Sequence, residues 1–169
     1  MKLRYSIALS LPLASASAMA ADLALKLDVP QLNVAEYHRP YIAAWVENAD
    51  QQVVANLAVL YDLKKRENGG AKWLKDMRTW WRKTGRELTL PMDGVSGATK
   101  APGEQTVSVD KAALDKLPAG QYTLLVEAAR EAGGREVVKV PLTLPVKSAQ
   151  TFSGQGKEEL GAVTVQVKP

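Results

Sequence analysis

A short run of small residues in the middle of the sequence ends in a threonine hydroxyl. It spans residues 93–99 and reads Asp-Gly-Val-Ser-Gly-Ala-Thr. Asp and Ser side chains bond to nearby backbone groups, and glycine adopts dihedral angles that other residues avoid, so this composition predicts a loop. Pro102 and Gly103 directly downstream reinforce that prediction. We therefore expect the Thr99 hydroxyl to be accessible to another protein.

The same residues resemble the flavinylation motif of the flavin-carrying subunits of sodium-translocating NADH:quinone reductases and related extracytoplasmic redox proteins. In that family a flavin transferase moves FMN from FAD onto the last Thr of the motif, as a phosphoester. The resemblance makes Thr99 the acceptor of covalent FMN. The alternative is a Gly/Ser turn between two strands that matches by accident. The recognition context that the resemblance implies is Asp93, Gly94, Ser96, Gly97 and Ala98.

The first twenty residues have the features of a secretory signal peptide. Lys2 and Arg4 form a basic start, an apolar run covers Ile7 to Leu13, and Ala18-Met19-Ala20 is an A-x-A cleavage site. We expect cleavage after Ala20, a mature chain that does not span a membrane, and a periplasmic location.

Composition limits the classes of function. The formal net charge is +4, and removal of the two positive charges of the signal peptide lowers it to +2, which is too mild to predict nucleic-acid binding. The sequence has no cysteine, so neither disulfides nor thiolate ligands are available to an exported protein. Residues 21–169 are long enough for one domain with a sizeable core, which we expect to be a single β-sandwich domain.

Most of the mature chain alternates between apolar and polar residues, as half-buried strands do. We expect strands at 23–27, 41–47, 53–61, 105–109, 122–128, 136–144 and 163–167, and a polar loop at 148–157. Pro141 favours an edge strand or a bulge. Seven or eight short strands predict an all-β, immunoglobulin-like antiparallel β-sandwich without the cysteine pair.

One segment departs from this alternation. Between Trp73 and Trp81, apolar residues recur at spacings of three, four and seven, with basic residues between them, which predicts one inserted amphipathic helix. The helix carries three of the four tryptophans. Neighbouring helix positions differ by about 100°, so Trp80 and Trp81 cannot both point inward. The three tryptophans either pack the helix onto the sandwich or offer a surface on which a flavin ring stacks, with Arg78, Arg82 or Lys100 near its phosphate.

The mature chain as a whole resembles a family of predicted periplasmic proteins that is catalogued as a domain of unknown function. The resemblance rests on residues 39–47, 72–74, 80–81, 93–103, 120–124 and 127–131. That family implies an association with PepSY-type membrane proteins and flavin transferases, and hence a role in extracytoplasmic electron transfer.

Other chemistry has little support in the sequence. His38, the only histidine, precedes a strand and is expected to be a loop residue rather than a metal ligand. No Ser-His-acid set or P-loop is present. The sequence therefore predicts a periplasmic electron carrier with FMN on Thr99 that has no substrate of its own. The alternatives are an unmodified adaptor domain that binds a protein or glycan through exposed loops and tryptophans, and a metal carrier that the lack of soft ligands opposes.

Overall fold

The computed structural model describes residues 23–169, so the predicted signal peptide and its predicted cleavage site lie outside the described residues. Two β-sheets dominate the described chain, and the all-β sandwich expected from the sequence is confirmed. The immunoglobulin-like assignment stays a prediction. Within residues 23–169, no helix has both the length and the apolar character needed to cross a bilayer.

The smaller sheet has four strands, in the order β5-β1-β9-β8, and every neighbouring pair in it is antiparallel. Apolar side chains alternate along β1 and β9, and they face the second sheet. The strands of the smaller sheet are β1 (Leu23–Val29), β5 (Gly103–Ser108), β8 (Gln150–Gln155) and β9 (Ala162–Val167).

The larger sheet has five strands, in the order β4-β3-β2-β6-β7. Its one parallel pair joins β3 to β4, which corrects the fully antiparallel arrangement expected from the sequence. Pro141 lies in β7 at the edge of the sheet, so the edge position predicted from this proline is confirmed. The strands are β2 (Tyr41–Glu47), β3 (Val53–Tyr61), β4 (Ser96–Ala98), β6 (Gly120–Ala129) and β7 (Arg135–Leu144).

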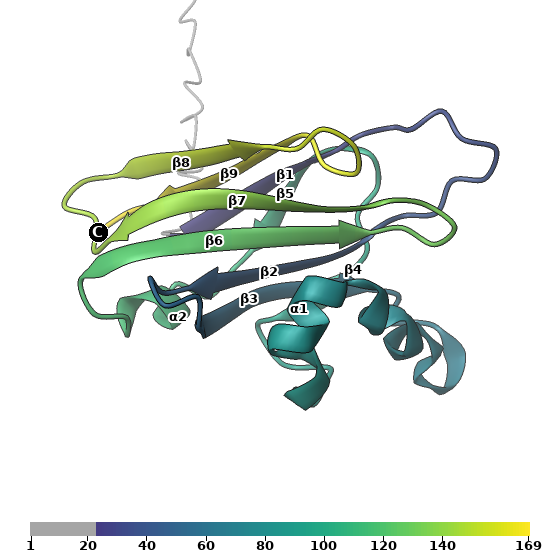
Figure 1. The fold of residues 1–169 in the computed structure, drawn as a ribbon, viewed down its shortest axis with the longest axis horizontal. Helices are drawn as coiled ribbons and strands as arrows, with labels where there is room; N and C mark the ends of the chain where they lie inside the picture. The colour runs from purple at the N-terminus through teal and green to yellow at the C-terminus, as the bar shows by residue number, and fades with distance from the viewer. Residues whose placement is uncertain (1–22) are drawn as a thin grey trace, which may run out of the picture.

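Three layers stack in the molecule, and the larger sheet is the middle one (Figure 1). Residues of β2 alternate between two apolar clusters: Ile42 and Ala44 face the smaller sheet, while Ala43 and Trp45 face a helical segment on the opposite side. Because both faces of this sheet are covered, β2 is buried along almost its whole length.

The helical segment differs from the single helix predicted from the tryptophan spacing. It consists of a 3₁₀ segment η1 (Arg66–Asp76), a six-residue helix α1 (Arg78–Lys83) and a short 3₁₀ turn η2 (Gly85–Glu87). The break falls at Met77, whose φ of −76° and ψ of 73° are not helical. Met77 is completely buried against the sheet, so packing of its side chain overrides the helical periodicity of its neighbours.

One further expectation is wrong. The polar stretch expected to be a loop at 148–157 contains strand β8, which pairs with β9 from Gln150 to Gln155. Its sequence shows little apolar alternation because β8 is an edge strand and most of its side chains are exposed. Asp110 lies two residues before the one-turn helix α2 (Ala112–Asp115), and its Oδ1 accepts a 2.9 Å bond from the Ala112 N–H.

A buried carboxylate fastens the helical segment to the sheet. Glu127 points outward from β6 under α1 and has no solvent exposure. It accepts hydrogen bonds from the backbone N–H groups of Thr79 at 3.1 Å and Trp80 at 2.7 Å. Arg135 of β7 donates to the same carboxylate at 2.8 Å. The first turn of α1, which has no capping side chain of its own, is thus capped from the sheet.

Tryptophan side chains complete the attachment of α1. Trp80 inserts into the second apolar cluster and donates from Nε1 to Asn56 Oδ1 on β3 at 2.9 Å. Lys83, at the end of α1, forms a 2.9 Å ion pair with the buried Glu47, which also accepts a 2.7 Å bond from Trp45 Nε1. The helix is therefore held at both ends and along its buried face.

A second carboxylate joins the two sheets. Glu136 at the start of β7 accepts bonds of 2.7 to 3.1 Å from four consecutive backbone N–H groups, at residues 157–160 between β8 and β9. Burial, the largest single influence, raises the pKa of Glu136, but the four hydrogen bonds to the ionised form together outweigh it and the net pKa is lowered.

We expect Glu127→Ala to lower the free energy of unfolding by about 2–4 kcal/mol, because two amide groups of α1 lose their acceptor in a dry site. Urea unfolding followed by tryptophan fluorescence measures this loss. Glu104→Ala is the matched control, since Glu104 is exposed and its contact with Lys26 is long, at 3.8 Å. We expect that control to change stability by less than about 0.5 kcal/mol, and equal losses in the two variants would contradict the capping role.

Stability should fall in acid partly through Glu136. A carboxyl whose pKa is lower in the folded state stabilises the fold above its unfolded pKa, near 4.5, and loses that contribution as the pH falls through the folded pKa. Thermal unfolding at a series of pH values should therefore show Glu136→Gln to be less stable than the parent at pH 7, with the difference shrinking below pH 4.5. A difference that stays constant across this range would argue against the effect.

Candidate functional site

The stretch from Asp93 to Thr99 forms a tight turn followed by a short strand. Gly94 has a positive φ of 73°, which a side chain would strain, and the N–H groups of Val95 and Ser96 both donate to the Met92 carbonyl. The Ser96 hydroxyl accepts a 2.9 Å bond from the Met92 N–H and closes the turn from the other side. Two motif residues thus have structural roles in this turn.

The second half of the stretch is strand β4, so the loop expected from its composition is only partly right. Residues 96–98 pair in parallel with the end of β3, and Ala98 lies opposite Tyr61. Gly97 lies against Leu60: a Cβ built at Gly97 would stand 2.8 Å from Leu60 Cδ2. A larger residue would have to displace the end of the Leu60 side chain, so glycine at this position lets β4 lie against β3 without moving it.

Thr99 immediately follows β4 and is half-buried. It lies at the end of the larger sheet where β3, β4 and β6 finish and β2 begins, because Tyr61 pairs with Ala98 and Tyr41 pairs with Ala129. Among the described residues, none forms a hydrogen bond with the Thr99 side chain. Its hydroxyl is therefore available for other chemistry.

A cleft of about 150 Å³ opens beside this residue, and we call it the Thr99 cleft. Strand ends supply one wall, and Lys65 together with Trp73 and Asp76 of η1 supplies the other. This is smaller than pockets that enclose a whole small molecule, so a ligand held here would be partly exposed. The lining residues are His38, Arg39, Tyr41, Asp62, Lys65, Trp73, Asp76, Thr99, Ala129 and Glu131.

Charges of both signs line the Thr99 cleft. Arg39 and Lys65 are its permanent cations, and neither is in an ion pair within the described chain. Three carboxylates share the lining, and one of them, Glu131, lies 3.8 Å from His38 Nδ1. Burial raises the pKa of the Tyr41 phenol, which keeps it neutral. The cleft thus pairs an available hydroxyl with cationic, anionic and aromatic groups.

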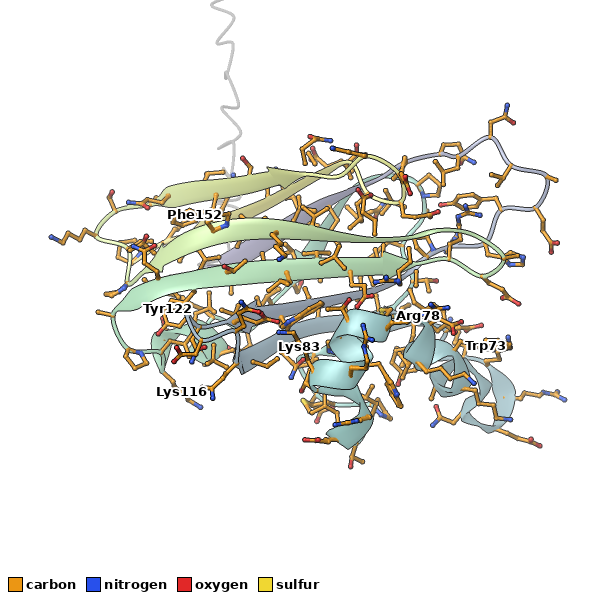
Figure 2. All side chains as sticks on the ribbon, in the orientation of Figure 1. Trp73, Arg78, Lys83, Lys116, Tyr122 and Phe152 are labelled. Carbon is orange, nitrogen blue, oxygen red and sulfur yellow. The ribbon has the colours of Figure 1, made fainter. Side chains whose placement is uncertain are left out.

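The three tryptophans of the helical segment have different environments. Trp73 on η1 is 42% exposed and lines the Thr99 cleft. Trp80 is wholly buried, so it packs the helix onto the sheet and offers no surface to a ligand. Trp81 is half-buried with its ring centre 6.2 Å from that of Trp80, and it does not line the cleft. Figure 2 shows Trp73 on η1, separate from Lys83 of α1.

The basic residues considered as phosphate partners lie away from the Thr99 cleft. Lys100 lines a separate groove between β4 and β5, together with Gly94 and Ser96. Arg78 does not line the Thr99 cleft but lines a groove that adjoins it and shares Trp73 and Asp76 with it, and Arg82 donates from Nε to the Arg78 carbonyl at 3.0 Å. Asp93 and Gly94 also line a third hollow, beside Asn56 on β3, so only the last residue of the motif reaches the Thr99 cleft.

Sequence reasoning missed several residues of this site. Arg39, Tyr41, Asp62 and Lys65 were not singled out, although a hairpin of residues 41–47 and 53–61 already places Tyr41 and Asp62 together. Glu127 was also missed, although a charged residue inside the apolar run Leu-Leu-Val-Glu-Ala-Ala is a detectable signal of a buried partner.

Comparison with known proteins identifies a family for this chain. The comparison with curated proteins finds no match, and the comparison with solved structures finds none either. One family, described as "Predicted periplasmic protein (DUF2271)", matches residues 22–162, a span that includes the larger sheet, the helical segment and the residues of the Thr99 cleft, and that ends at the start of β9. The chain belongs to this family of predicted periplasmic proteins.

Proposed function

We propose that the protein is a periplasmic electron carrier that holds FMN as a phosphoester on Thr99. The observation that carries this proposal is the position of Thr99: its hydroxyl has no hydrogen-bond partner in the described chain and lies in a cleft with an exposed indole and two cations. The resemblance of residues 93–99 to a flavinylation motif gives the chemistry, and the periplasmic description of the family agrees with the compartment.

The residues of the site fit the attachment of this group. The Thr99 oxygen would attack the FMN phosphorus of FAD, the bond between the two phosphates would break, AMP would leave, and the hydroxyl proton would pass to a base of the flavin transferase. Arg39 and Lys65 would pair with the negative charge of the resulting phosphodiester, in a lining that also holds the carboxylates of Asp62, Asp76 and Glu131. The turn at Gly94 and the short strand β4 hold Thr99 at the surface, where the transferase can approach it.

FMN supplies the ability to accept and donate one or two electrons. The protein supplies attachment, position and electrostatic environment. The expected partners are a flavin transferase and a membrane redox protein of the PepSY type, with which the carrier would exchange electrons. A cleft that leaves a bound group partly exposed suits such an exchange.

A second candidate is an unmodified domain that binds a protein or glycan. The observation in its favour is the exposed indole of Trp73, since sugars stack on such surfaces. The two candidates differ in a simple property, because a purified flavin carrier is yellow and an unmodified binding domain is colourless.

The flavin proposal predicts that co-expression with a flavin transferase yields protein with an FMN adduct, seen by intact mass and by fluorescence in a denaturing gel. Thr99→Val should abolish the adduct, because it removes the hydroxyl and keeps the shape of the side chain. The melting temperature should be nearly unchanged, since the hydroxyl makes no hydrogen bond in the described chain.

Thr151→Ala provides the control for this experiment. Thr151 is an exposed threonine on β8, far from the motif in the sheet order, and this variant should keep the full adduct. A parent protein without any adduct, or a Thr99→Val protein that still carries one, would overturn the proposal.

A further inference from the structure

Trp73 has an indole ring without an aromatic partner. The aromatic contacts in residues 23–169 join Tyr41 to Tyr61 and Trp80 to Trp81, and neither pair includes Trp73. Its neighbours in η1 and at the break, Leu74 and Met77, are buried in the second apolar cluster and anchor the backbone that carries it. An exposed tryptophan on an anchored backbone is a rigid surface for stacking rather than a loose side chain.

Trp73 and Thr99 reach the same cleft from different elements. One comes from η1 and the other from the end of β4, and the 150 Å³ between the walls is too small to enclose a large ligand. A planar group tethered at Thr99 would therefore lie across the cleft with one face on the protein. Tethering makes even a weak stack effective, because the local concentration of the group reaches roughly millimolar values.

No other described tryptophan offers this surface at the Thr99 cleft. Trp45 and Trp80 are both wholly buried, and each donates its Nε1 hydrogen to a side chain of the sheet. Trp81 packs beside Trp80 and does not line the cleft. The sequence allowed three tryptophans as stacking partners, and of these only Trp73 lines the Thr99 cleft.

We infer that Trp73 is the surface on which the flavin ring attached to Thr99 rests, and that it positions the ring with its other face toward solvent. This inference rests on the proposed function. It assigns Trp73 a positioning role that is separate from attachment, since the transferase needs the Thr99 hydroxyl and the motif rather than the indole. Loss of Trp73 should therefore change the environment of the flavin without preventing its attachment.

Flavin fluorescence tests this inference, because a stacked indole donates an electron to the excited flavin and quenches its emission, whereas a phenyl ring does not. In the flavinylated protein, Trp73→Phe should raise the emission per flavin severalfold. Trp81→Phe is the matched control: it makes the same change on the neighbouring helix and should leave the emission unchanged. Intact mass gives the amount of adduct in each variant.

The outcomes separate this inference from the proposal on which it rests. Full adduct with equal emission in the parent and in Trp73→Phe would overturn the stacking role and leave the flavin attachment standing. If no adduct forms, titration of free FMN into the unmodified parent and Trp73→Phe proteins gives the answer. Saturable quenching of FMN by the parent that disappears in Trp73→Phe supports the Trp73 surface alone. If the parent does not quench FMN either, both the stacking role of Trp73 and the flavin attachment are overturned.

Discussion

Glu127 accepts hydrogen bonds from two backbone amides of α1 and from Arg135 while its side chain lies wholly out of solvent. A buried carboxylate is tolerated only when its oxygens are paired, so α1 and the sheet are tied to one relative position. The apolar cluster around Trp80 and Met77 also holds the helical segment against the sheet, but hydrophobic contact is not directional. The hydrogen bonds of Glu127 fix the orientation of α1 on the sheet, and thereby help to position the preceding segment η1, which carries Trp73.

The position of Thr99 depends on a different constraint. The short strand β4 pairs in parallel with β3. The turn at Gly94, closed by the hydrogen bond from the Met92 N–H to the Ser96 hydroxyl, leads the chain to that edge of the sheet. The residues of the motif thus divide into those that shape the backbone and the one that carries the hydroxyl. The Thr99 cleft exists because these two constraints meet, one fixing the helical wall and the other fixing the strand end.

Local patterns were enough to predict much of this fold. The strands at 41–47 and 53–61 were predicted with the bounds that the structure has, since two strands that follow each other closely depend on neighbouring residues. Pro141 marked an edge strand because it cannot donate to a sheet. Strand β8 was not predicted because its exposed residues lack apolar alternation. The helix was predicted without its break because the conformation of Met77 is set by packing against the sheet rather than by the neighbouring residues.

The candidate site was predictable only in part, because local patterns do not reveal contacts between distant segments. Thr99 was identified from a motif, but the residues around it arrive through the parallel pairing of β3 with β4, which joins segments more than thirty positions apart. No local signal distinguishes the exposed Trp73 from the buried Trp80. The choice between core and ligand surface followed from tertiary packing alone.

Peptide mapping of the protein isolated from its natural host tests the central claim most directly. Trypsin cleaves after Arg86 and Lys100, so the whole motif falls in one peptide, residues 87–100. The account predicts that this peptide carries FMN and that fragmentation places the phosphoester on Thr99. An unmodified peptide from a host that produces a flavin transferase, or a flavin on any other residue, would contradict it.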